Sequence, residues 1–182
     1  MTHRGMMRAT RSKPAPSFDE PLEMLAACHE RIEDTLATLE RLARHLESAG
    51  NDAEARAAAQ AVLRYFDRAS PQHHQDEEED LFPALLESMA GSDAVCIREL
   101  TDALAADHRR LQAAWAKLRE PLVAVAEGRS SELPAAEVEA FVALNESHGA
   151  REDAELLPMA ERLLDDAALA RIGDAMRHRR DL

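Results

Sequence analysis

Aromatic residues and cysteine are scarce in this sequence of 182 residues. Aromatics make up 3% of it, which argues against a fold dominated by sheets, because strands favour aromatic and β-branched side chains. The two cysteines, Cys28 and Cys96, exclude a disulfide framework and a four-cysteine zinc site. No apolar run approaches the roughly 18 residues of a membrane span, and the basic start lacks the apolar core of a secretory signal. We therefore expect a protein of the reducing cytoplasm that does not enter membranes.

Positive charge is also in short supply. Lys and Arg number 22 against 35 Asp and Glu, which gives a net charge of −13. Nucleic acid and anionic lipid are bound through clustered Lys and Arg, so neither is an expected partner. The sequence has no Ser-His-Asp order, glycine-rich phosphate loop, Cys-x-x-Cys or His-Glu-x-x-His. Hydrolase and nucleotide-binding functions therefore have no support.

The sequence is rich in Ala and Leu at helical spacing. Hydrophobic residues make up 46% of it, and most of them are Ala or Leu, which favour helices. Four long segments carry apolar residues at alternating steps of three and four, as the inward face of a helix requires. Short connections make neighbouring helices antiparallel. We predict an all-α, up-down-up-down four-helix bundle over residues 17–165, after a flexible N-terminal arm (1–16) and before a short C-terminal helix with a basic tail (166–182).

Capping residues and prolines mark the expected helix ends. Ser17–Glu20 is typical of a capping box that opens the first helix, and Gly50 is typical of its end. Asn51–Glu54 resembles a capping box for the second helix. Pro83 and Pro158 are expected to kink or end the second and fourth helices. The other expected boundaries are Gly91, Ser92–Asp93, Gly128, Ser130–Pro134 and Asp165.

Each of the four apolar stripes contains one histidine. These are His29, His73, His108 and His148. Counting residues from each histidine to the nearest turn places all four within about 6 Å of one level in an antiparallel bundle. A lone histidine in such a stripe is usually a hydrogen-bonded core residue. Four of them at one height, all on inward faces, predict a shared site.

Two glutamates extend this cluster. Glu77 follows His73 by four residues, and Glu152 follows His148 by four, so each pair shares a helix face. A buried carboxylate or imidazole must be paired or metal-bound, because burying it alone costs several kcal/mol. If each glutamate bridges two ions, the protein supplies about eight of roughly twelve bonds at two octahedral sites. The predicted metal ligands are His29, His73, Glu77, His108, His148 and Glu152.

The two His-Glu pairs lie in a repeated segment. Residues 73–83 (HHQDEEEDLFP) and 148–158 (HGAREDAELLP) both read H-x-x-x-E-x-x-x-L-[FL]-P. With the single histidines in Cys28–Ile32 and Asp107–Leu111, they resemble the hemerythrin-like family, also called the HHE cation-binding domain, over roughly residues 18–165. The resemblance implies a bundle around two non-haem iron ions, bridged by oxo or hydroxo groups and carboxylates, with manganese or zinc as substitutes. It also implies that the centre binds dioxygen, nitric oxide or peroxide.

The register of the second helix allows an alternative. His74 and Glu78 are also four residues apart. The repeat selects His73 and Glu77, so His74 is expected to point about 100° away, toward solvent or a neighbouring helix. The rest of the acidic run from Glu77 to Asp80 is expected to be a solvated face.

One position departs from the oxygen-carrying members of the family. Those proteins carry a fifth histidine one turn along a helix, where Leu104 and Gln112 flank His108 here. The more open coordination favours sensing, nitric oxide binding or redox turnover over reversible oxygen carriage. Because ligand histidines must be neutral, metal binding is expected to weaken below about pH 6.

Two other functions compete with this one. A ferritin-like bundle for iron oxidation or storage needs Glu-x-x-His on two helices, and no glutamate lies three residues before any of the four histidines. A metal-free helical bundle that binds a protein partner through its outer faces is the second alternative, and the sequence does not identify that partner. Whether the protein is an enzyme also stays open.

Overall fold

The computed structural model describes residues 16–88 and 93–182, and every regular element within them is helical, which confirms the predicted all-α class. In chain order the elements are α1 (Pro21–Ala49), α2 (Ala53–Arg64), η1 (Tyr65–Ala69), α3 (Ser70–Gln75), η2 (Asp76–Leu81), α4 (Phe82–Ser88), α5 (Asp93–Ala126), α6 (Ala135–Arg151), η3 (Glu152–Leu156), α7 (Leu157–Leu163) and α8 (Asp166–Arg179). The segments labelled η are π-helical.

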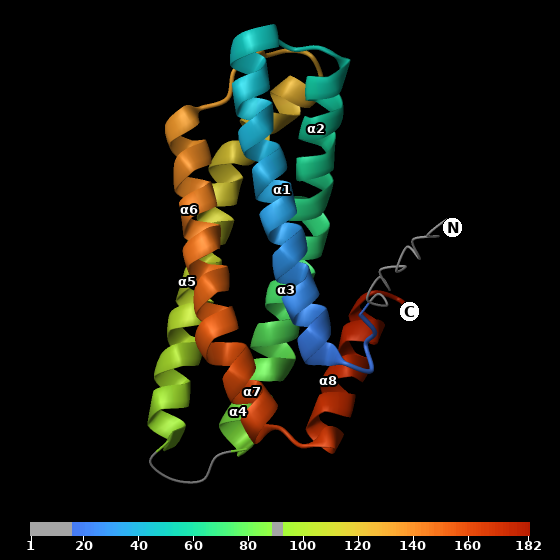
Figure 1. Cartoon of the computed structure of the whole chain (residues 1–182), viewed down its shortest axis with the longest axis vertical. Helices are drawn as coiled ribbons and strands as arrows, with labels where there is room; N and C mark the ends of the chain where they lie inside the picture. The colour runs from blue at the N-terminus through green and yellow to red at the C-terminus, as the bar shows by residue number, and fades with distance from the viewer. Residues whose placement is uncertain (1–15, 89–92) are drawn as a thin grey trace, which may run out of the picture.

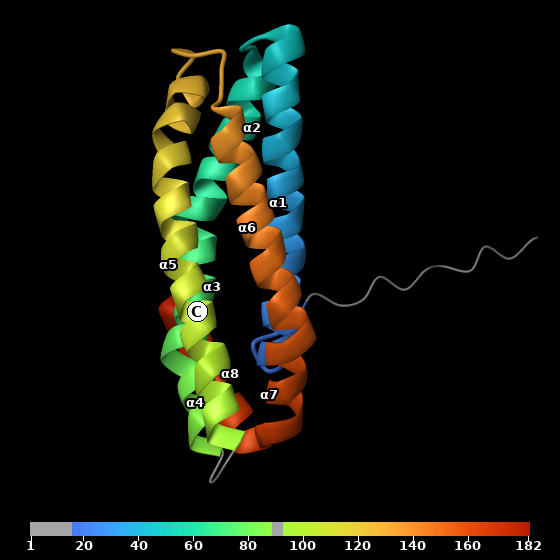
Figure 2. The ribbon, with the colours of Figure 1, turned by 90° about the vertical axis from the view of Figure 1, so that its left-hand side faces the viewer.

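These segments join into four long rods and one short helix in the described part of the chain (Figures 1 and 2). The rods are α1, then α2 through α4, then α5, then α6 through α7. Rod α1 packs against α2 and α6, and α5 packs against the same two, so the rods alternate in direction around a square. The predicted up-down-up-down bundle is therefore confirmed. Helix α8 lies beside α1 and η2 at the lower end of the bundle (Figure 1).

The first helix begins later than the sequence pattern predicted. The Ser17 hydroxyl donates to the Asp19 carboxylate and accepts from the Asp19 backbone N–H, so it closes a short turn and caps no helix. Helix α1 then begins at Pro21. Proline costs no hydrogen bond there, because a backbone N–H in the first turn of a helix has no acceptor within the helix. It ends before Gly50 as expected, because a backbone φ of 76° is open to glycine without steric penalty.

The second predicted cap is shifted by one residue. Asp52, and not Asn51, accepts from the Ala55 backbone N–H at the start of α2. Asn51 instead donates to the backbone carbonyls of Val125 and Ser130, which ties the loop after α1 to the loop after α5. Asp165 caps α8 as predicted. Three predicted features fall wholly or mostly outside the described residues: the N-terminal arm, Gly91 and Ser92. The domain boundaries stay a prediction.

Each π-helical segment of the described chain is followed, two residues later, by a proline. The three prolines are Pro71, Pro83 and Pro158. Proline has no N–H, and its ring clashes with the carbonyl four residues back, so a locally widened turn lets the helix pass it. Of the two expected effects, a kink or an end, the second does not occur at Pro83 and Pro158, since those helices continue to Ser88 and Leu163.

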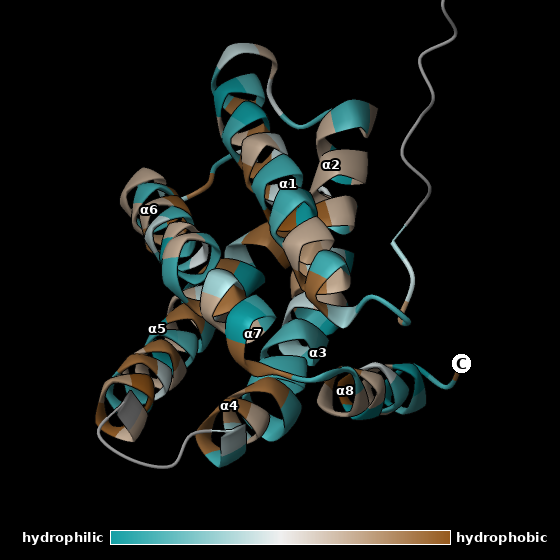
Figure 3. Cartoon of the chain, turned by 60° about the horizontal axis from the view of Figure 1, so that its bottom comes forward, coloured by the Kyte–Doolittle hydropathy of each residue, from teal (hydrophilic) through white to brown (hydrophobic). Residues whose placement is uncertain are grey.

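The buried apolar residues form two separate clusters along the bundle. One contains Leu25, Leu81 and Leu104 and extends onto α8, and the other contains Phe66 and Phe141. Hydrophobic residues face inward and hydrophilic residues face outward on most helices (Figure 3). The interruption between the two clusters is a layer of buried histidines and carboxylates.

Candidate metal centre

The six predicted ligands come from all four long rods and meet in this polar layer. Each of them is at most 5% exposed, although charged residues are rarely buried without partners. They are His29 on α1, His73 on α3, Glu77 on η2, His108 on α5, His148 on α6 and Glu152 on η3.

Within the described residues, these side chains form two groups that share both carboxylates. In each group one ligand atom per residue lies within 4.8 Å of every other. The first group is His29, His73, Glu77 and Glu152, and the second is Glu77, His108, His148 and Glu152.

The shared carboxylates lie between the histidines of the two groups. Glu152 has one oxygen 3.1 Å from His29 Nε2 and the other 3.1 Å from His148 Nε2. Glu77 likewise lies 3.4 Å from His73 Nε2 in one group and 3.3 Å from the α5 histidine in the other. Because each carboxylate reaches both groups, the arrangement can bridge two cations.

Unpaired polar atoms test whether cations fit here. Among the described residues, eight buried side-chain nitrogen and oxygen atoms have no hydrogen-bond partner, and all eight belong to predicted ligands. They include both oxygens of Glu77 and of Glu152. Each unpaired buried polar atom costs about 1–3 kcal/mol, and metal coordination would remove that penalty for six of the eight, all but His73 Nδ1 and His148 Nδ1. The residues present therefore fit a centre of two metal ions.

Two further carboxylates orient histidines from outside this layer. Asp153 accepts a hydrogen bond from His29 Nδ1 at 2.6 Å, and Glu78 accepts one from His108 Nδ1 at 2.6 Å. A carboxylate on Nδ1 turns Nε2 toward a metal and raises its basicity. Each of the two directly follows a ligand glutamate in the repeat. From the sequence, Glu78 is considered only as an alternative ligand, and Asp153 is not identified. The acidic residue that follows each predicted ligand glutamate in the repeat could have indicated both positions.

His74 lies against a neighbouring helix, as one of its two predicted positions required. Its ring stacks on His108 with centroids 4.0 Å apart and planes at 12°. One of its nitrogens lies within 4.8 Å of nitrogens of His108 and His148. Two parallel rings at this separation cannot both direct an in-plane nitrogen at one ion. In this arrangement His74 packs against His108, which is one of the predicted ligands.

In the metal-free centre, protons on buried side chains offset the charge of the carboxylates. Burial opposes a charged imidazole at His29, but the nearby carboxylates of Glu152, Glu77 and Asp153 outweigh it and raise the His29 pKa to about 9. The same balance, with the carboxylates of Glu152, Glu77 and Glu78, raises the pKa of His108 to about 10. At neutral pH both imidazoles therefore carry a proton when no metal is bound.

The pKa values of the two predicted ligand glutamates are shifted in opposite directions. Burial, reinforced by the charge of Glu152, raises the pKa of Glu77 to about 8. Burial also opposes ionisation of Glu152, but the imidazoles of His108, His148 and His29 around its oxygens hold its pKa well below the usual range. Burial lowers the pKa of His73 to about 3. The metal-free centre therefore keeps one carboxylate ionised and stores protons on His29, His108 and Glu77.

The acidic run after Glu77 is largely a solvated face, as expected, since Glu78 and Glu79 are exposed and Asp80 is half-buried. Asp76, just before Glu77, is fully buried and pairs with Arg179, the last residue of α8, and with Arg180, which follows it. Arg179 also pairs with Glu79 and Asp80. The basic C-terminal segment thus fastens α8 to η2, the segment that carries Glu77.

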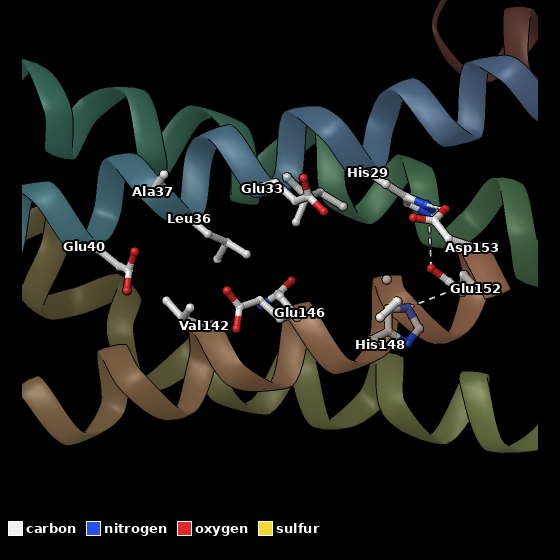
Figure 4. Close-up of a pocket in the computed structure, with 14 residues that line it drawn as sticks. His29, Glu33, Leu36, Ala37, Glu40, Val142, Glu146, His148, Glu152 and Asp153 are labelled. Atoms are coloured by element: carbon white, nitrogen blue, oxygen red, sulfur yellow. Dashed lines mark hydrogen bonds and ion pairs between the residues drawn. The ribbon is translucent and has the colours of Figure 1, made fainter.

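Two cavities reach the centre from different sides. A cavity of about 400 Å³ lies between α1 and α6 and has His29, His148 and Glu152 in its lining (Figure 4). A cavity of about 290 Å³ lies between the second rod and α5, and its lining includes His74, His108, Gln112, Trp115 and Phe141.

Comparison with known proteins agrees with this geometry. The model of the family described as hemerythrin HHE cation binding domain matches residues 20–160. The chain belongs to this family. The hemerythrin-like chain is also 30% identical, over 166 residues, to an uncharacterized protein of Haemophilus influenzae. The aligned region covers 91% of this chain and 93% of that protein. The matched residues of the family include all six predicted ligands, so the hemerythrin-like bundle is a cation-binding one. Within residues 16–88 and 93–182, no helix is long and apolar enough to cross a membrane.

Proposed function

We propose that this hemerythrin-like protein holds two iron ions at the six-residue centre and there binds, senses or reduces dioxygen, nitric oxide or peroxide. The observation that supports it is the pair of ligand groups that share Glu77 and Glu152. His29 and His73 would hold one ion, and the other two histidines the second. When bound, iron would supply electrons and open coordination positions to the small ligand. Manganese and zinc are the expected substitutes.

The surrounding residues prepare the centre for such a ligand. Asp153 and Glu78 hold two imidazoles with Nε2 turned inward. The apolar clusters above and below the layer leave the two cavities as its routes to solvent in the described part of the chain. The six ligands leave roughly four of twelve octahedral positions to solvent or to the ligand. Gln112, one of the two positions where a fifth histidine could lie, lines the cavity between the second rod and α5. We therefore favour ligand sensing or turnover over oxygen carriage.

The competing functions fit the structure less well. A metal-free interaction bundle would leave eight buried polar atoms unpaired among the described residues, which is a large penalty for no gain. A ferritin-like centre uses glutamates three residues before its histidines, and Asn145 occupies that position before His148. For location, the free thiols of Cys28 and Cys96 are consistent with the reducing cytoplasm, which we propose as its compartment.

Metal content is the measurement that tests this function. Protein purified without chelator or a histidine tag is expected to contain about two irons per chain, with near-ultraviolet absorption that changes on reduction by dithionite and on exposure to air. The double variant His73→Leu/His148→Leu should lose the iron and stay folded. The matched control His178→Leu changes an exposed histidine of α8 and should keep it. Absence of iron after anaerobic Fe(II) loading of the natural sequence would contradict the proposal.

A further inference from the structure

We propose that the cavity between α1 and α6 is the path by which divalent metal cations reach the centre. The inference rests on the cation-binding role of the bundle and not on which small ligand the loaded centre takes. Figure 4 shows the inner end of this cavity at His29, His148 and Glu152, and its outer part along Glu33, Glu40 and Glu146.

The charge of the cavity lining suits a cation. Glu33 and Glu40 project from α1 and Glu146 from α6, and all three are exposed at the outer part of the cavity. Of the described residues that line it, none is Lys or Arg. A cleft lined by charge of one sign raises the local concentration of the opposite ion and can raise association rates 10-fold or more. In the other cavity, which is lined by aromatic residues, the charge of its carboxylate Glu78 is offset by that of Arg109.

The inner end of the cavity offers ligands that lack partners. Glu152 is fully buried, and neither of its oxygens accepts a hydrogen bond from the described residues. His148 Nδ1, in the same lining, is also buried without a partner. Glu152 belongs to both ligand groups, so a cation that arrives there can pass to either position. Acidic side chains at the mouth and an unpaired shared carboxylate at the floor therefore form a continuous path.

Gly149 keeps this path open. It lies on α6 in the cavity lining, and a Cβ built at this position would meet no atom within 4 Å. A glycine inside a helix costs about 1 kcal/mol relative to alanine, so its presence here is not explained by helix stability. A long side chain at residue 149 would extend into free space next to His148 and narrow the cavity.

Metal uptake followed over time tests the path. Anaerobic Co(II) is mixed with metal-free protein at low ionic strength, and its visible absorption reports arrival at the centre. The variant Glu33→Gln/Glu146→Gln should take up cobalt at least about fivefold more slowly, with unchanged final stoichiometry and a weaker dependence on salt. The control Glu47→Gln/Glu139→Gln removes the same charge from exposed positions of the same two helices and should match the natural protein.

A second pair of variants tests whether the open space beside Gly149 is needed for metal uptake. Gly149→Leu should slow uptake, whereas Gly149→Ala should leave the rate nearly unchanged and raise the melting temperature of the metal-free protein, because alanine favours a helix. Equal uptake rates in the charge variant and its control, or in both Gly149 variants, would overturn the path. So would a reduced final stoichiometry in the charge variant, because that would make Glu33 or Glu146 a ligand. The iron content of the natural protein separately decides the proposed function.

Discussion

Metal loading should release protons well above the pH at which ordinary histidines titrate. The metal-free centre stores protons on His29, His108 and Glu77, whose pKa values lie at about 9, 10 and 8. A metal ligand must give up its proton, so binding of two cations at pH 8 should release about two to two and a half protons per chain. Four histidines with ordinary pKa values and two ordinary glutamates would together release only about 0.1.

Metal binding should therefore weaken at a higher pH than the sequence alone predicted. A weakening of metal binding below about pH 6 assumes unperturbed histidines. With the raised pKa values of His29, His108 and Glu77, protons already compete with metal at pH 7 to 9. The apparent affinity for the pair of ions should therefore fall by up to about three orders of magnitude for each pH unit near pH 7.

Calorimetry and nuclear magnetic resonance measure the two sides of this exchange. Titration of metal-free protein with Mn(II) in two buffers of different ionisation enthalpy gives the number of protons released. Nitrogen spectra of the metal-free protein show the charge of each imidazole directly and exclude protons that come from metal-bound water. Neutral rings at His29 and His108 at pH 8 would refute the reasoning, whatever the calorimetric count.

Three further predictions concern stability and ligand orientation. The variant Asp153→Asn should lower metal affinity about 10- to 100-fold in equilibrium titrations, while Glu155→Gln, two residues along, should not; equal affinities would remove the positioning role. The variant Arg180→Met removes one of the two partners of buried Asp76 and should lower the free energy of unfolding by about 2 kcal/mol, because Arg179 still pairs with it, and the addition of Asp76→Asn should restore part of the loss. The raised pKa values of His29, His108 and Glu77 stabilise the folded state at low pH, and this effect is lost as the pH rises through 8 to 10. The metal-free protein should therefore lose stability from pH 7 upward, by up to about 3 kcal/mol per pH unit in denaturant titrations, and the metal-loaded protein should not.

The local pattern of the sequence was enough to predict the bundle and the six candidate ligands. Helical spacing decides which residues face inward, and the alternation of three and four steps placed His29 and His108 on those faces. The i to i+4 spacing within each repeat identified Glu77 and Glu152 in the same way. These properties depend on residues within one helix, so they can be read without knowing how the helices pack.

The contacts between distant segments depended on the tertiary structure. Asp153 meets His29 across 124 positions of the chain, and Asp76 meets two arginines of α8 across more than 100. No local rule pairs such residues, because the packing of the rods decides which outer faces approach. The raised pKa values and the acidic cavity follow from the same packing, since burial and cavity shape belong to several helices at once. The sequence by itself determined which chemistry faces the core, and only the folded bundle decided how that chemistry is oriented, protonated and reached.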